Sequence, residues 1–220
     1  MAKFLTPDGK TDISKEEFVK LYSDIYYWRN SIFVEEKIFD LLYKNKLSPR
    51  DVFDILAWKT GKINHKKSEQ NKKMIYYKGW REDDLKATIY SNEIEINKIY
   101  EALEKISDQS ISSYIEAFSS NISGIGPVYA LTLRYFISKG SEPIYDKYAR
   151  MALWSILDKK RGCKSEPTFN NIEKVYKSYK DMIIEVFEEE YNNRNDNPNK
   201  WRQVDQALWA YGHCLNVDAS

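Results

Sequence analysis

Glycine and proline are scarce in this chain, with 8 glycines and 6 prolines among 220 residues. Because both residues interrupt helices, their scarcity favours a fold built from helices. Helix-start signals agree with this. Ser14 and Glu17 form a capping-box pattern. Ser48 is a candidate N-cap, followed by Pro49 at the first helical position and by the acidic Asp51 at the third. The sequence therefore predicts an all-α fold.

Apolar residues recur at spacings of three and four along most of the chain, as on the buried face of a helix. The length allows one domain, residues 1–220, with a sizeable buried core. Helices are expected over residues 14–28, 32–47, 49–59, 84–105, 110–119, 127–138, 147–157, 170–191 and 201–215.

The overall charge excludes several classes of protein. Lys and Arg number 34 and Asp and Glu number 33, a net charge of +1, which excludes a uniformly basic nucleic-acid coat and an acidic tail. No stretch approaches the roughly 18 apolar residues that a membrane span requires, so no membrane partner is expected. The first residues lack the apolar core of a signal peptide, and Cys163 and Cys214 are too few for a disulfide framework. We expect a cytoplasmic protein, associated with the nucleoid if the source is bacterial.

Residues 59–81 form a strongly basic segment. It has eight basic residues against one acidic residue, Glu69, a net charge of +7, and aromatic residues are interleaved. Such a segment suits a phosphate backbone and exposed bases, although a solvated lysine-rich loop is the alternative. The predicted DNA contacts are Lys62, Lys66, Lys67, Lys72 and Lys73.

A Gly-x-Gly turn precedes the helix that Pro127 is expected to begin. Gly124, Ile125 and Gly126 can form a tight turn that leaves backbone amides uncovered. Amides at a helix N-terminus can bind a DNA phosphate, so these three residues are also predicted DNA contacts. By itself the pattern is more often a plain turn between two helices.

The run from Ile122 to Asp146, with its Gly-x-Gly turn and the later Pro143-Ile144-Tyr145-Asp146, resembles the helix-hairpin-helix DNA glycosylase superfamily, which includes the 8-oxoguanine glycosylase-like fold. The segment from Val204 to Cys214 is similar to the final helix of these enzymes. The resemblance implies two closely packed helical lobes. The hairpin lobe would span about residues 84–157, and the N-terminal helices and the C-terminal helix would form the other.

The resemblance also implies roles for particular residues. The hairpin would hold the backbone of the damaged strand, and Asp146 would act at the sugar of a flipped nucleotide. Val128, 18 residues before Asp146, occupies the position of the Schiff-base lysine in bifunctional members and cannot form an imine. Hydrolysis without lyase activity is therefore expected. Aligning on Pro143 instead would put Tyr145 in the catalytic position, and Asp146 is also a suitable N-cap.

The aromatic residues Tyr129, Tyr145 and Tyr148 are candidates for a pocket that holds the flipped base, although core packing is the alternative. We expect a monomeric base-excision N-glycosylase that binds DNA with a damaged or modified base and uses no metal and no organic cofactor. Two alternatives remain open. One is a catalytically degenerate helix-hairpin-helix protein that binds DNA or a protein partner, and the other is a helical interaction protein in which Gly-x-Gly is only a turn.

Overall fold

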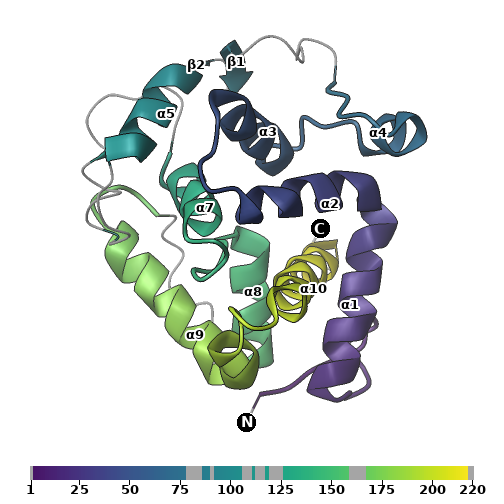
Figure 1. Ribbon diagram of the computed structural model, residues 1–220. Helices are drawn as coiled ribbons and strands as arrows, with labels where there is room; N and C mark the ends of the chain where they lie inside the picture. The colour runs from purple at the N-terminus through teal and green to yellow at the C-terminus, as the bar shows by residue number, and fades with distance from the viewer. Residues whose placement is uncertain are drawn as a thin grey trace. The chain divides into compact units, whose positions relative to one another are not determined.

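The computed structural model of the chain describes residues 2–77, 86–89, 92–105, 111, 117–118, 126–158 and 167–217. Over these residues the secondary structure is helical apart from one two-stranded sheet and two isolated β-bridges (Figure 1). The predicted all-α class is confirmed at this level. The chain forms two compact units: unit 1 comprises residues 1–29, 143–166 and 174–220, and unit 2 comprises residues 30–142 and 167–173.

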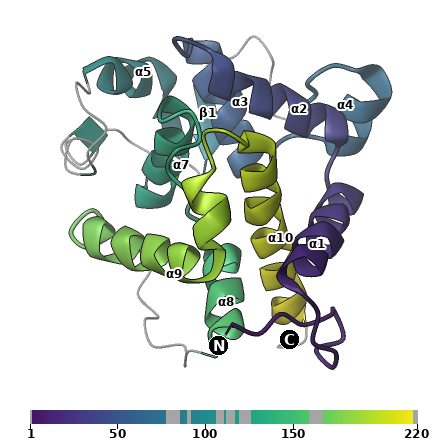
Figure 2. The same cartoon turned by 60° about the horizontal axis from the view of Figure 1, so that its bottom comes forward.

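Unit 1 is built around its last helix. Its helices are α1 (Lys15–Arg29), α8 (Lys147–Ile156), α9 (Ile172–Asn192, from residue 174 onward) and α10 (Pro198–Val217). Helix α10 packs along both α1 and α8 and lies between them in Figure 2. Phe18 and Tyr22 of α1 meet Tyr211 of α10 with ring centroids 5.2 and 5.0 Å apart. The aromatic residues of the two ends of the chain therefore share one core.

Unit 2 contains the remaining elements. These are α2 (Ile32–Asp40), the 3-10 helix η1 (Leu41–Tyr43), α3 (Pro49–Lys59), α4 (His65–Asn71), β1 (Lys86–Ile89), β2 (Asn92–Glu95), α5 (Ile96–Lys105) and α7 (Pro127–Ile137). Helix α3 packs against α5 and α7, and α2 packs against α4. Val52, Ile55 and Leu56 of α3 are almost completely buried, so α3 supplies much of this core.

The predicted capping box at Ser14 and the predicted N-cap at Ser48 are confirmed, and Ser48 also forms a capping box. The hydroxyl of Ser14 accepts a hydrogen bond from the amide of Glu17 at 3.1 Å, and the Glu17 carboxylate accepts from the amide of Ser14 at 2.9 Å. At α3 the hydroxyl of Ser48 accepts from the amide of Asp51 at 3.2 Å, and the Asp51 carboxylate accepts from the amide of Ser48 at 2.7 Å. These boxes fix the start of one helix in each unit.

The prediction of a helix over 84–105 is wrong for its first half. The described residues there, 86–89 and 92–95, form a β-hairpin. Strands β1 and β2 pair antiparallel, with Lys86 opposite Glu95 and Ile89 opposite Asn92. The residues from Glu93 to Ile96 alternate between charged and apolar, which is the period of a strand. The apolar residues at helical spacing continue only beyond Ile96, so the helix is confined to α5.

One other boundary differs from expectation. The helix predicted over 32–47 ends at Asp40 and continues only as η1, while the predicted helix 110–119 lies mostly outside the described residues. The predicted helices at 127–138, 147–157, 170–191 and 201–215 correspond to α7, α8, α9 and α10.

Helix α8 groups with α1 and α10, whereas the resemblance put residues 84–157 in one lobe. None of the described helices is long and apolar enough to cross a membrane.

Candidate active site

Asp146 is the N-cap of helix α8. Its backbone is extended, with φ −141° and ψ 141°, and its carboxylate accepts a hydrogen bond from the amide of Tyr148 at 2.8 Å. This confirms the capping role that the sequence allowed for Asp146. The residue is half-buried, so part of its surface stays accessible, and a carboxylate can accept several hydrogen bonds at once. Asp146 therefore combines a fixed position with partial access to solvent.

The segment before Asp146 is held by two tyrosines of α9. Tyr176 donates to the carbonyl of Pro143 and Tyr179 donates to the carbonyl of Ile144, each at 2.9 Å. Burial, together with the nearby charges of Asp205 and Asp146, raises the pKa of Tyr179, so its phenol stays protonated and remains a donor. The backbone on both sides of Asp146 is thus fixed by hydrogen bonds.

An aromatic stack lies next to Asp146. The rings of Tyr148 and His213 are stacked, with centroids 3.5 Å apart and planes inclined by 28°. Trp209 lies on α10 four residues before His213, and the centroids of these two rings are 3.9 Å apart. Lys147 places its ammonium group 4.8 Å from the centre of the Tyr148 ring. Tyr148 and Trp209 both pack against the His213 ring, so the edge of the ring that carries the two nitrogens is what remains for hydrogen bonds.

Gly212 makes this stack possible. A β-carbon at Gly212 would lie 2.0 Å from the carbonyl oxygen of Tyr148, a distance that no side chain tolerates. Only glycine lets α10 come this close to the start of α8. Sequence patterns did not single out His213, because its contact with Tyr148 depends on how α8 and α10 pack.

His213 is neutral at pH 7. Burial lowers the pKa of His213 to about 4; the charge of Asp146 opposes this, while the charges of Arg29 and Lys147 add to it. Its Nε2 atom is buried and has no hydrogen-bond partner among the described residues. A neutral imidazole with an unsatisfied ring nitrogen therefore lies within the electrostatic reach of a half-buried carboxylate.

Two of the three candidate pocket tyrosines are buried. Tyr145 has no exposed surface and packs edge-on against Tyr179, with ring centroids 5.1 Å apart. Tyr129 of α7 is 7% exposed. Both observations favour core packing for these two residues. Tyr148, which is half-buried and lies beside Asp146, keeps an accessible position.

Gly126, the one predicted hairpin residue that the structure describes, belongs to unit 2, and Asp146 belongs to unit 1. Gly126 is the N-cap of α7 with φ −92°, and no side-chain hydrogen bond caps this helix. Gly124 and Ile125 lie outside the described residues. Val128 is half-buried in the first turn of α7. The predicted start of a helix at Pro127 is confirmed, whereas phosphate binding by its amides stays a prediction.

The basic segment is folded over residues 62–77. Ile63 and Tyr76 form an antiparallel bridge, and helix α4 lies between them. The amide of Tyr77 donates to the carbonyl of Lys62 at 2.9 Å, and the amide of Asn64 donates to the carbonyl of Ile75 at 2.7 Å. The five predicted DNA contacts are exposed, or half-buried in one case: Lys62 (half-buried), Lys66, Lys67, Lys72 and Lys73.

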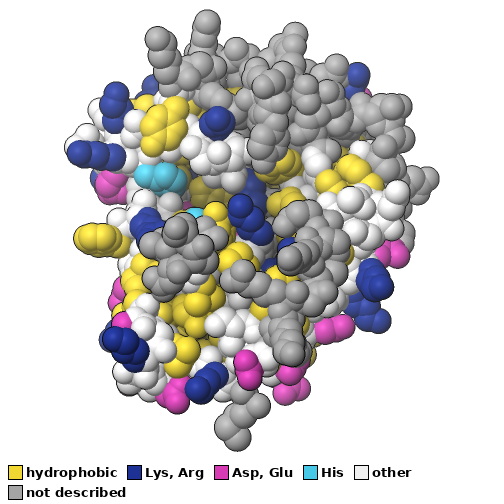
Figure 3. Space-filling model, turned by 180° about the vertical axis from the view of Figure 1, so that it is seen from behind, with side chains coloured by type: hydrophobic (Ala, Val, Ile, Leu, Met, Phe, Trp, Pro, Cys, Tyr) yellow, Lys and Arg dark blue, Asp and Glu magenta, His cyan; other side chains and the backbone are white. Residues whose placement is uncertain are grey.

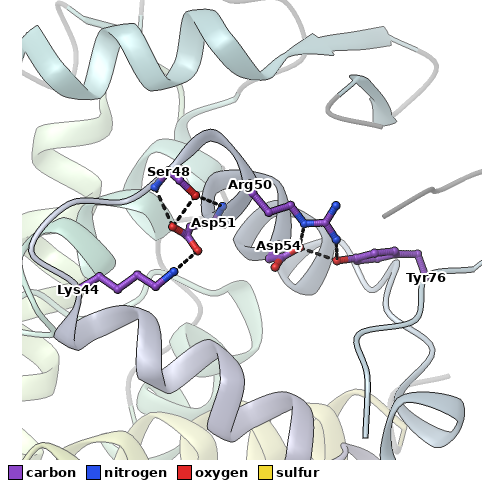
Figure 4. Close-up of polar contacts among 6 residues, drawn as sticks. All are labelled: Lys44, Ser48, Arg50, Asp51, Asp54 and Tyr76. Carbon is purple, nitrogen blue, oxygen red and sulfur yellow. Dashed lines mark hydrogen bonds and ion pairs between the residues drawn. The ribbon is translucent and has the colours of Figure 1, made fainter. Parts of the chain in front are cut away.

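Figure 4 shows how Tyr76 fixes this segment to α3. Arg50 donates to the phenol of Tyr76 at 2.6 Å, and the phenol donates to Asp54. Burial and the neighbouring Asp54 raise the pKa of Tyr76, so the phenol remains a donor. The same figure shows Lys44 paired with Asp51, the acidic residue of the α3 capping box.

The other end of the segment is fixed to the start of α2. Nδ1 of His65 accepts from the amide of Ser31 at 3.0 Å. Glu69 accepts from the hydroxyl of Ser31 at 2.6 Å and from the amide of Phe33 at 2.9 Å, and it pairs with Lys72. The backbone of the segment is therefore held in place, while most of its lysines extend into solvent.

Exposed Lys and Arg side chains, hydrophobic side chains and histidine all contribute to the surface seen in Figure 3. Within the described ranges, no three His, Cys, Asp or Glu side chains gather as a possible metal site. The chemistry available at Asp146 is that of a carboxylate, a neutral imidazole and two aromatic rings. Comparison of the chain with protein-family models, with curated proteins and with solved structures finds no match.

Proposed function

We propose that the protein is a DNA N-glycosylase that hydrolyses the N-glycosidic bond of a flipped nucleotide, with Asp146 as the acting carboxylate. The observation that supports this most is the fixed position of Asp146 at the start of α8, beside the stacked rings of Tyr148 and His213. An extruded base needs aromatic surfaces and polar edges around it, and the reaction needs a carboxylate held near the sugar. Both requirements can be met within unit 1.

In the proposed reaction a water oxygen bonds to C1′ while the bond from C1′ to the base nitrogen breaks. Positive charge develops on the sugar as the base departs, and the carboxylate of Asp146 stabilises it. Asp146 also orients the water and accepts one of its protons, and the departing base takes a proton from solvent. Because hydrogen bonds already hold the backbone around Asp146, little reorganisation is needed at the moment of reaction.

The basic segment supports the DNA part of the proposal. Its exposed lysines lie on a backbone that is fixed to α2 and α3, so they are presented from an ordered surface. Neutralising phosphates with lysines releases counterions and provides affinity without sequence preference. Base selection would then depend on the residues around Asp146.

The test is a panel of duplexes that carry different damaged or modified bases, cleaved with heat and alkali to reveal abasic products. We expect excision from at least one duplex, and a loss of about 100-fold or more in the single-turnover rate for Asp146→Asn. The amide retains a hydrogen-bond acceptor for the Tyr148 amide, so melting temperature and DNA affinity should stay close to wild type. Asp146→Ala is the less informative variant because it also removes the cap. Wild-type rates for Asp146→Asn would show that Asp146 is only a cap.

A degenerate DNA-binding protein is the second candidate, and Val128 is the observation that favours it. Valine stands where the resemblance puts the amine nucleophile of bifunctional enzymes. This candidate predicts salt-sensitive DNA binding without excision from any duplex of the panel. The two functions are therefore separated by the same experiment.

A further inference from the structure

The Nε2 atom of His213 is buried in a way that needs explanation. Tyr148 and Trp209 pack against the ring, and Nε2 has no hydrogen-bond partner among the described residues. An unsatisfied buried polar atom is costly, and native proteins usually satisfy such groups or use them. A phenylalanine would fill the same space between the two rings without that cost. The nitrogen edge of the ring therefore points to a function.

The chemistry of this edge restricts the ligand. A neutral imidazole offers one donor and one acceptor and no charge, so it has little attraction for a phosphate. The edges of nucleobases carry donors and acceptors in the same plane as the ring, and the faces of Tyr148 and Trp209 provide apolar surroundings that exclude water. Asp146, which would act at the sugar, is close enough to influence the ring electrostatically.

We propose that His213 reads the polar edge of the extruded nucleobase by a hydrogen bond through Nε2, between the rings of Tyr148 and Trp209. This role rests on the proposed glycosylase function and adds a specificity-determining residue to it. Since Nε2 is covered in the unbound protein, neighbouring side chains must change rotamer when the base enters, as is common on binding. Gly212 contributes by allowing α10 to bring His213 against Tyr148.

The first experiment uses His213→Phe and His213→Gln. Phenylalanine keeps the ring between Tyr148 and Trp209 but removes both nitrogens, while glutamine keeps a hydrogen-bonding group at about the position of Nε2. On the duplex that wild type cleaves, we expect His213→Phe to lower the single-turnover rate about 100-fold, while affinity for an undamaged duplex stays unchanged and the melting temperature is at or above that of wild type. His213→Gln should recover part of the rate. Equal rates for wild type and His213→Phe would overturn the proposal.

The second experiment does not depend on excision. The ring nitrogens of His213 are observed by 15N NMR while the protein is titrated with each duplex of the panel in an uncleavable 2′-fluoro form. A shift of the His213 nitrogens that occurs with one target base and not with an undamaged duplex would support base reading. An unchanged His213 signal at saturation with every duplex would overturn it.

The two experiments distinguish the possible failures. Excision by wild type with no effect of His213→Phe would leave the glycosylase function standing and remove the role of His213. A base-dependent His213 shift without excision would support base reading and argue against catalysis. The absence of both excision and shift would contradict both proposals.

Discussion

Gly212 of α10 faces the carbonyl oxygen of Tyr148 so closely that a β-carbon on Gly212 would lie 2.0 Å from that oxygen. The obstructing atoms belong to the backbone, so they cannot turn away as a side chain would. Since Asp146 caps the same turn of α8 through the amide of Tyr148, a change at Gly212 acts on the candidate site as well as on helix packing.

Gly212→Ala should separate α8 from α10. Overpacking against backbone is expected to lower the free energy of unfolding by about 3 kcal/mol, or roughly 6 to 12 °C in Tm for a chain of this size. Thermal melting measures the change. Gly126→Ala is the matched control, because Gly126 has φ −92° and nothing within 4 Å of an added β-carbon. A similar Tm for both variants would show that α10 does not need this close approach.

Local signals in the sequence predicted much of the fold. The signals that predicted it are short-range patterns, and each is confirmed: the capping box at Ser14, the N-cap at Ser48, Pro127 at the start of α7 and Asp146 as an N-cap. The β-hairpin before Ile96 was missed because isoleucines there also fit a helical spacing. Alternation from Glu93 to Ile96 was the available contrary signal.

The surroundings of Asp146 were less predictable. Tyr148 and His213 are 65 positions apart, and their stacking depends on how α8 and α10 pack, which periodicity does not encode. Tyr176 and Tyr179 could be predicted as buried, but not as donors to the backbone before Asp146. Glycine at position 212 is the one local hint, since it interrupts an otherwise continuous helical pattern.

DNA binding should depend on the basic segment. Replacing Lys62, Lys66, Lys67, Lys72 and Lys73 with Gln should weaken binding and reduce the slope of log affinity against log salt, by about 0.9 for each phosphate that is no longer neutralised. Lys72 should contribute little, because Glu69 already pairs with it. Affinity is measured by fluorescence anisotropy over a range of salt concentrations.

The control for this variant removes the same charge elsewhere. Five exposed lysines of unit 1 serve the purpose, namely Lys3, Lys10, Lys20, Lys174 and Lys177. Their replacement with Gln changes the net charge equally, so a general charge effect would alter both slopes alike. An unchanged slope for the basic-segment variant would remove its five lysines from the interface.

Borohydride should trap no covalent adduct between the protein and DNA. Valine at position 128 has no amine, so the resemblance predicts hydrolysis and not imine formation. The assay is denaturing electrophoresis of the protein with a labelled substrate duplex and borohydride, beside a bifunctional glycosylase on its own substrate. A trapped adduct would mean that another lysine attacks C1′, and Lys59 at the end of α3 would be the first to replace.

Glu69 should make stability depend on pH in the acid range. Hydrogen bonds from Lys72 and Ser31 and from the amide of Phe33 lower the pKa of Glu69 to about 2. The folded state therefore releases this proton more readily than the unfolded chain, and the stabilisation is complete above about pH 4.5 and lost as pH falls towards 2. The difference in Tm between wild type and Glu69→Gln should shrink over this range. Glu16→Gln, on the exposed face of α1, controls for the loss of one negative charge, and a constant difference would exclude the linkage.

His213 should titrate far below a normal histidine. Burial lowers the pKa of His213 to about 4, against about 6.5 in an unfolded chain, and the charge of Asp146 only partly opposes this. Between these values the unfolded chain binds the additional proton, so the free energy of unfolding falls as pH drops from 6.5 to 4.

The measurement is direct because the chain has only 2 histidines. His213→Phe assigns the two ring Cε1 proton signals by NMR, and their shifts are then followed from pH 8 to pH 4. The His213 signal should keep the shift of a neutral ring down to about pH 5, whereas in urea both signals should move with midpoints near 6.5. Between pH 6.5 and 4 the Tm should fall in both proteins, and the fall should be smaller in His213→Phe than in wild type. A His213 midpoint at or above 6.5 in the folded protein would mean that the ring is solvated and not enclosed between Tyr148 and Trp209.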